Sequence, residues 1–238
     1  MDIFTHKKLK YKFISIVRLP NGDESIYSSI KKISFSSKWN GKLNCVLKSS
    51  NNEMLNNREL EYFDKIMLKV GKTIYPIEFE MSNRGNFYRM TNYNDVVHRW
   101  KICTSSIISE YSNAELLTKY IDVCGANIQS EDLLLNSIKQ DLFIQLFFLD
   151  RFNSSVQVVI YNFPKGEERH ELQFHKDNEC KNEYLFSTKY YYDDINSIAE
   201  LQCRYSNDGI PTYISLVYTI DNKKEGTFTK RVLIDLIN

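Results

Sequence analysis

Glycine and proline are scarce in this chain of 238 residues, which has eight glycines and four prolines. No stretch rich in Pro, Gly or Ser divides it, so no linker marks a boundary between two domains. We therefore expect one domain over residues 1–238, with enough hydrophobic residues (42%) for a substantial core. Within it, the sequence suggests a subdivision into a strand-rich part (1–91), a helical part (92–150) and a β-meander (151–238).

An excess of either charge is also lacking, because 31 Lys and Arg residues are balanced by 30 Asp and Glu residues. A domain that binds nucleic acid usually carries a basic excess, so we expect no nucleic-acid partner. Lysines alternate with aromatic residues near the N-terminus, a pattern that can serve single-stranded nucleic acid. We interpret it instead as a charged edge strand that resists aggregation. The residues concerned are Lys7, Lys8, Lys10, Tyr11, Lys12 and Phe13.

Long apolar runs are absent as well. The most apolar run, residues 142–149, is shorter than the ~18 residues of a membrane span and contains Gln145. The first eleven residues are polar and lysine-rich, without the apolar core of a secretory signal. We therefore expect a soluble protein with no membrane span. The abundance of Asn, Lys, Ile, Ser and Tyr is typical of AT-rich genomes and suggests a bacterial source.

The five cysteines form no recognisable framework. Their number is odd, their spacing is wide and no pair has the C-x-x-C spacing, which argues against both a disulfide scaffold and a zinc site. Free thiols fit a reducing compartment, so we expect a cytoplasmic location, and we expect neither a metal nor a cofactor. The cysteines are Cys45, Cys103, Cys124, Cys180 and Cys203.

Alternating apolar residues predict strands in the first fifty residues. Asn-Gly pairs at Asn21-Gly22 and Asn40-Gly41 predict the turns between about three strands, the last of them over residues 43–48. A polar loop is expected over residues 49–57. It is followed by a helix over residues 58–70 that Gly71 ends, and by a strand pair at 73–81 and 86–90.

Helical spacing dominates the middle of the chain. Asn92 is expected to cap a first helix, and a second helix is expected over residues 113–124. Ser130 is expected to cap a third, whose wide apolar stripe continues to Leu149 and places it at the centre of the core.

From Ser154 onward the apolar period is two, and short polar turns separate the runs. Short turns join antiparallel strands, because parallel strands need long crossovers. The expected fold class is therefore α+β: an N-terminal antiparallel meander, central helices, and a C-terminal antiparallel β-meander with the helices packed on one face.

No motif assembles a catalytic site. His170 and His175 lie in a segment with the spacing of a strand, where an interval of five places them on opposite faces. His98 lies on a predicted helix without a local nucleophile or orienting acid. The sequence leaves open whether the protein is an enzyme, although the lack of an assembled motif argues against it. An enzyme would need these histidines to converge with a carboxylate in a cleft.

Tyrosines are numerous, at 16, and cluster in the C-terminal meander beside two acidic residues. Tyrosine is favoured at protein interfaces, although it also populates strands. The leading hypothesis is a non-enzymatic binding protein that acts through protein–protein contacts, as an immunity protein, adaptor or chaperone. The alternatives are a carrier of an apolar small ligand in a cavity between sheet and helices, and the enzyme described above; the oligomeric state stays open. The interface residues proposed are Tyr184, Tyr190, Tyr191, Tyr192, Asp193 and Asp194.

Overall fold

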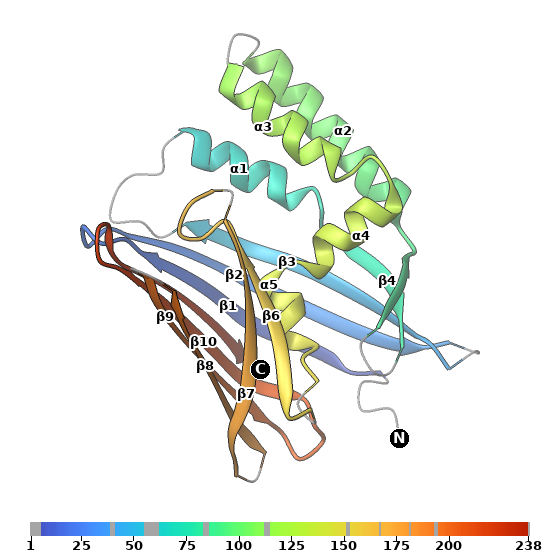
Figure 1. Cartoon of the computed structure of the whole chain (residues 1–238). Coiled ribbons are helices and arrows are strands. Elements are labelled where there is room, and N and C mark those ends of the chain that lie inside the picture. Colours follow the sequence, from blue (N-terminus) through green and yellow to red (C-terminus); the bar gives the residue numbers. More distant parts are fainter. Residues whose placement is uncertain are drawn as a thin grey trace.

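The computed structural model describes residues 6–38, 41–54, 62–82, 86–111, 115–150, 153–166, 168–180, 182–192 and 195–237. These ranges contain one antiparallel sheet of eleven strands and five helices (Figure 1). The strands are β1 (Lys8–Arg18), β2 (Glu24–Ser37), β3 (Leu43–Met54), β4 (Ile77–Met81), β5 (Phe87–Met90), β6 (Ser155–Tyr161), β7 (Arg169–Cys180), β8 (Glu183–Tyr192), β9 (Ile195–Tyr205), β10 (Pro211–Asn222) and β11 (Gly226–Leu236). The helices are α1 (Tyr62–Lys72), α2 (Tyr93–Glu110), α3 (Glu115–Ala126), α4 (Glu131–Lys139) and α5 (Leu142–Phe147). None of the helices in these ranges has the length and apolar character needed to cross a bilayer.

The two meanders expected from the sequence join into a single sheet. Its strand order is β5-β4-β3-β2-β1-β11-β10-β9-β8-β7-β6. The junction is the antiparallel pairing of β1 with β11, which runs from Tyr11 opposite Leu236 to Arg18 opposite Thr229. The first and last strands of the chain are therefore central neighbours, and β1 is not the edge strand that its lysines suggested. The mixed content of helices and antiparallel strands confirms the α+β class.

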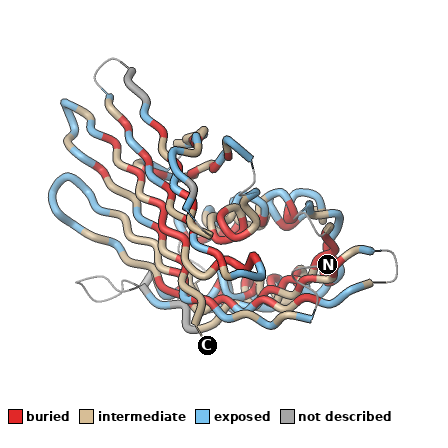
Figure 2. Tube along the Cα trace, turned by 90° about the horizontal axis from the view of Figure 1, so that it is seen from below, coloured by how far each residue is buried: buried red, intermediate tan, exposed pale blue. Residues whose placement is uncertain are grey.

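The core lies along the inner face of the strongly curved sheet (Figure 1). Buried and exposed residues alternate along the strands (Figure 2), as a sheet with one buried face requires. Helix α5 brings two aromatic rings against this face: the centroid of the Tyr11 ring lies 6.1 Å from that of Phe143 and 5.3 Å from that of Phe147. The fully buried Tyr11 also donates a hydrogen bond from its hydroxyl to the carbonyl of Pro211 at 2.9 Å. These contacts tie α5 to the centre of the sheet.

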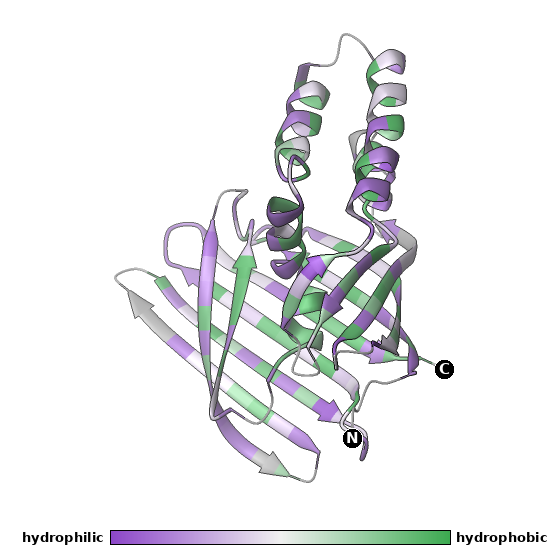
Figure 3. Cartoon of the chain, turned by 90° about the vertical axis from the view of Figure 1, so that its right-hand side faces the viewer, coloured by the Kyte–Doolittle hydropathy of each residue, from purple (hydrophilic) through white to green (hydrophobic). Residues whose placement is uncertain are grey.

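Of the other four helices, α2 and α3 form one group, and α1 and α4 contact the sheet. Helices α2 and α3 form a hairpin that projects from the sheet (Figure 3). Helix α1 contacts β3 and α2, while α4 contacts β5 and α5. Residues of α1, α3, α4 and α5 line one pocket together with residues of β1 to β4, and this pocket is the candidate site.

The single helix expected over residues 130–149 is wrong, because the structure divides it into α4 and α5. Asp141 has an extended backbone and its Oδ1 accepts a hydrogen bond from the backbone N–H of Ile144 at 3.2 Å, so it caps a new helix. Gln145 accepts from the Val159 N–H at 2.8 Å and donates to the Val159 carbonyl at 2.9 Å. Gln145, the polar residue in the apolar run, thereby provides hydrogen-bond partners for both backbone groups of Val159 on the edge strand β6.

The predicted start of α2 is confirmed in position, because Asn92 is its N-cap residue, whereas the predicted end of α1 is wrong. The side chain of Asn92 makes no capping hydrogen bond to α2; it accepts from the Glu78 N–H and donates to the Pro76 carbonyl, each at 2.9 Å. Asn92 therefore joins α2 to the start of β4. Gly71 lies inside α1, which continues to Lys72, so it does not end the helix.

The polar loop expected to begin at residue 49 is a continuation of β3 as far as Met54. This segment pairs with β2, with Met54 opposite Tyr27, after a shift of register. Pairing with a longer neighbouring strand extends β3 beyond its apolar residues. Residues 55–57 of the predicted loop and residues 58–61 of the predicted helix lie outside the described residues.

The lysines of β1 belong to a basic row on the outer face of the sheet. Lys10 lies opposite Lys32, and Lys32 lies opposite Lys48, so three exposed lysines stand side by side across β1, β2 and β3. Like charges directly opposite each other destabilise a sheet.

We expect Lys32→Glu to raise the free energy of unfolding by about 0.5–1 kcal/mol, because it replaces two repulsive cross-strand pairs with two attractive ones. Urea unfolding at low ionic strength measures the change. Lys32→Gln, which removes the repulsion alone, should give a smaller gain. Equal stability of wild type and Lys32→Glu would contradict the register described here.

Glu80 on β4 is a buried carboxylate, with 6% of its side chain exposed, and it contacts three cations. Arg89 donates to it from Nε and Nη2, each at 3.0 Å, Lys38 forms a second ion pair, and Nζ of Lys42 lies 3.9 Å away. The hydrogen bonds from Arg89 and Lys38 lower the pKa of the Glu80 carboxyl to about 2.

Because the pKa of Glu80 is depressed in the folded state, its stabilisation is present above the ordinary pKa of 4.5 and is lost as the pH falls to about 2. We expect Glu80→Gln to be less stable than wild type at neutral pH, with the difference shrinking between pH 4.5 and 2. Urea unfolding at a series of pH values measures it. Glu115→Gln, at an exposed position of α3, is the control and should change stability by less than about 0.5 kcal/mol. A difference for Glu80→Gln that persists unchanged at the lowest pH would contradict the prediction.

Candidate functional site

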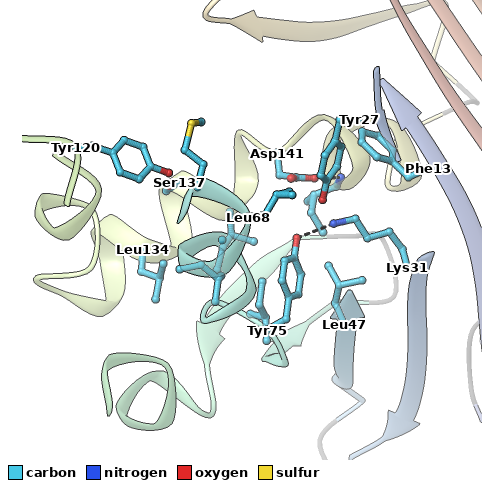
Figure 4. Close-up of a pocket in the computed structure, with 16 residues that line it drawn as sticks. Phe13, Tyr27, Lys31, Leu47, Leu68, Tyr75, Tyr120, Leu134, Ser137 and Asp141 are labelled. Atoms are coloured by element: carbon cyan, nitrogen blue, oxygen red, sulfur yellow. Dashed lines mark hydrogen bonds between the residues drawn. The ribbon is translucent and has the colours of Figure 1, made fainter. Parts of the chain in front are cut away.

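A pocket of about 460 Å³ lies between the inner face of the sheet and the helices (Figure 4). Strands β1 to β4 form its floor, and helices α1, α3, α4 and α5, with the segment before β4 and the break between α4 and α5, supply the rest of its wall. This volume falls within the range of about 300–1,000 Å³ that is typical of small-molecule sites.

Most of the pocket wall is apolar. The alternation of inward side chains along the strands places apolar residues in its floor, and apolar side chains of α1 and α4 face them. Such a wall accommodates a hydrocarbon body. The apolar side chains include Phe13, Leu47, Leu68, Ile77, Leu134 and Ile138.

Polar groups gather at one end of the pocket. Figure 4 shows Lys31, Tyr75, Tyr27 and Asp141 at one end, and Tyr120 at the other. The four residues of the first group come from β2, from the segment before β4 and from the break between α4 and α5. The same break that divides the predicted long helix therefore places a carboxylate in the pocket wall.

Lys31 is the central polar residue of this group. It is only 3% exposed, because its position in β2 points inward between the buried residues Ser29 and Ile33. Its Nζ donates a hydrogen bond to the hydroxyl of Tyr75 at 2.9 Å. It also lies 4.5 Å from the centroid of the Tyr75 ring and 5.8 Å from that of Phe13. These ring faces attract the cationic form of the amine.

Lys31 has no direct ion pair in the described part of the chain, where no carboxylate oxygen lies within 4.0 Å of its Nζ. Burial lowers the pKa of Lys31, and the charge of Asp141 opposes this effect. A buried ammonium without a contacting counter-ion is costly, which makes it a marker of function.

The two tyrosines beside Lys31 remain protonated at neutral pH. Burial raises the pKa of Tyr75 well above its ordinary value, and the negative charge of Asp141 adds to the rise. Burial and Asp141 also raise the pKa of Tyr27. The polar end of the pocket thus offers one amine, two phenol hydroxyls and one carboxylate. This set can donate to and accept from the polar group of a bound molecule.

Of the interface residues proposed from the sequence, only Tyr184 has a described side chain, and it does not line this pocket. Tyr184 is 7% exposed, and its ring packs against that of Tyr205 with 5.6 Å between centroids. The structure does not describe the side chains of residues 190–192, and Asp193 and Asp194 lie outside the described residues. Protein contact through these six residues stays a prediction.

The three histidines considered as catalytic candidates do not line the pocket either. His98 is exposed on α2 and His175 is exposed on β7. His170 is half-buried on β7, with Nδ1 3.1 Å from the hydroxyl of Tyr218 and Nε2 3.3 Å from a carboxylate oxygen of Glu168. Two of the three histidines are therefore exposed, and one is half-buried. The hypothesis of an enzyme built from these residues stays a prediction.

Comparison with known proteins provides no family assignment, because no protein-family model matches the chain and no curated protein matches it. Within the described ranges, no group of three or more His, Cys, Asp or Glu side chains is placed to hold a metal ion. The functional argument therefore depends on the pocket itself.

The sequence did not identify the four polar residues at the Lys31 end of the pocket, although Lys31 itself stands at an unusual position. The inward positions of β2 have the order Tyr27, Ser29, Lys31, Ile33, Phe35, with a lysine in the middle of a buried face. A charged residue at an inward position is uncommon and marks a special environment. Asp141 carried no such signal, because the apolar stripe runs through the helix break.

We expect Lys31→Met to leave the free energy of unfolding unchanged or to raise it by about 1–3 kcal/mol, since methionine has a similar shape and removes a buried charge. Chemical denaturation measures the change. Lys8→Met, at an exposed position of β1 opposite Ser34, is the control and should shift stability by less than about 0.5 kcal/mol. A loss above about 2 kcal/mol for Lys31→Met would show that the lysine serves the fold.

Proposed function

We propose that this protein binds a small apolar molecule in the pocket between sheet and helices, with the polar end of the molecule at Lys31. The observation that carries the proposal is a lysine only 3% exposed at the polar end of a pocket of about 460 Å³. A fold that needed only a packed core would gain stability by replacing this lysine with an apolar residue. Its presence in the pocket wall is explained if it contacts a ligand.

Two further features support this proposal. Apolar side chains line most of the pocket, whereas Lys31, Tyr75, Tyr27 and Asp141 gather at one end, so an amphiphilic ligand can place its polar group there and its hydrocarbon part along the remaining wall (Figure 4). The proposal includes the arrangement expected from the sequence, in which the helices cover one face of the sheet. In this arrangement α1 and α4 cover the pocket, and their separation from the sheet gives a ligand its volume.

Gly71 on α1 offers a way to close the pocket without disturbing the core. It is exposed and lines the pocket, which places it at the mouth, and a Cβ added there would meet no atom within 4 Å. A phenylalanine at this position can therefore fill the mouth, whereas an alanine cannot. Both substitutions favour the helix over glycine.

We expect 1-decanol to bind the wild-type protein and Gly71→Ala, and to bind Gly71→Phe at least about tenfold more weakly, because the aromatic side chain occupies the mouth. Isothermal titration calorimetry measures the affinity, and a ligand-dependent rise in Tm provides a second measurement. Circular dichroism controls for folding of both variants. Equal binding by all three proteins, or no binding of 1-decanol by wild type, would contradict the proposal.

A second candidate function is contact with a protein partner, in an immunity, adaptor or chaperone-like role. It is favoured by large apolar side chains that are exposed on the projecting α2–α3 hairpin: Ile102 is 60% exposed, Leu116 78% and Val123 68%. Leu116 and Val123 are seven positions apart and so share one face of α3.

We expect Leu116→Ser combined with Val123→Ser to leave 1-decanol binding unchanged and to abolish co-purification of a stoichiometric partner from the native source. Size-exclusion chromatography with mass spectrometry measures this. Co-purification of the same partner by wild type and variant would contradict a role for this face.

A further inference from the structure

The amine of Lys31 is placed for chemistry as well as for hydrogen bonding. One of its three N–H donors is engaged by the Tyr75 hydroxyl at 2.9 Å, and no carboxylate in the described ranges fixes the amine in an ion pair. Lys31 is only 3% exposed, so its amine is largely desolvated. A nucleophilic amine in an apolar, shielded pocket is the arrangement that carbonyl chemistry requires.

The charges around Lys31 decide which polar group suits this end of the pocket. Asp141 lines the same end and acts on Lys31 through its negative charge. A carboxylate on the ligand would be attracted by Lys31 and repelled by Asp141, so the pair favours no anion. A neutral carbonyl oxygen escapes this repulsion and can accept hydrogen bonds from the hydroxyls of Tyr75 and Tyr27.

We propose that Lys31 forms a reversible imine with an apolar aldehyde that binds in the pocket, an inference that rests on the proposed ligand-binding function. The alkyl body of the aldehyde lies along the apolar wall, and its carbonyl carbon lies at Lys31. The ligand class is thus a medium-chain apolar aldehyde.

The reaction balances without an oxidant or a reductant. The neutral Lys31 amine attacks the carbonyl carbon, a C–N bond forms, and one proton moves from the nitrogen to the oxygen to give a carbinolamine. The carbinolamine then loses its hydroxyl and a second nitrogen-bound proton as water, leaving a C=N double bond. The Tyr75 hydroxyl, already within hydrogen-bond distance of Nζ, is the group placed to hand protons between nitrogen and oxygen.

The protonation of the site agrees with this chemistry. Burial lowers the pKa of Lys31, so a larger fraction of its amine is neutral than for a lysine in water. The raised pKa of Tyr75 keeps its hydroxyl protonated and able to donate.

The experiment uses the full chain, decanal in less than stoichiometric amount, and sodium cyanoborohydride, whose hydride reduces an imine to a stable secondary amine. Intact-mass analysis counts the added decyl groups, and peptide mapping locates them. We expect at least about tenfold more label on Lys31 than on any other lysine. Lys31→Arg should lose this label, and Gly71→Phe should lose it as well, because the mouth of the pocket is then filled.

Lys230→Arg is the matched control. Burial also lowers the pKa of Lys230, which lies 5.7 Å from the centroid of the Phe163 ring, but this lysine does not line the pocket. Its replacement should leave the labelling of Lys31 unchanged. Tyr75→Phe keeps the ring and removes the hydroxyl, so it should slow labelling by roughly tenfold, and circular dichroism controls for folding of the variant.

The outcomes separate this inference from the proposed function. Binding of 1-decanol together with labelling spread evenly over surface lysines would overturn the imine and leave ligand binding standing. Failure of 1-decanol and decanal alike would overturn both. Labelling of Lys230 equal to that of Lys31 would also overturn the imine, since burial of an amine alone would then explain the reactivity. If Lys31→Arg fails to fold, Gly71→Phe provides the same test.

Discussion

The pairing of β1 with β11 is the constraint on which the rest of the structure depends. It joins strands from the two ends of the chain and turns two meanders into one sheet of eleven strands within the described residues. The resulting wide sheet is twisted and curved, with α5 against its concave face (Figure 1). The Tyr11 ring, packed against Phe143 and Phe147, then fixes α5 at the centre of that curve. The position of the pocket beside α5 follows from this pairing.

The break between α4 and α5 links the fold to the site. An unbroken helix would run past the sheet, whereas the Asp141 cap redirects the chain so that Phe143 and Phe147 meet the core. The same carboxylate lines the pocket near Lys31 and partly balances its buried charge. One residue therefore serves the local structure, the packing and the electrostatics of the pocket.

Much of the secondary structure could be predicted from the sequence, and the tertiary relations could not. Alternation of apolar residues predicted strands in the first fifty residues, where β1, β2 and most of β3 lie, because one face of each strand is buried. The β1–β11 pairing could not be found this way, since strand order depends on contacts between distant segments. Side-chain caps of helices also depend on tertiary contacts. Asn92 has the chemistry of a cap, but its side chain bonds to the start of β4. Asp141 caps α5, although the apolar pattern of the sequence continues from α4 into α5 without a break. The candidate site was predictable in kind, as a cavity between sheet and helices. Its residues were not, except that Lys31 stands out at an inward position of β2.

The central claim is that Lys31 is buried in order to meet a ligand in the apolar pocket. A crystal structure of the protein grown with 1-decanol tests it most directly. The account predicts one alcohol molecule in the pocket, with its hydroxyl within hydrogen-bond distance of Lys31 Nζ and its alkyl chain extending along the apolar wall toward Leu134. A pocket filled by its own side chains, or an alcohol bound with its hydroxyl away from Lys31, would contradict it.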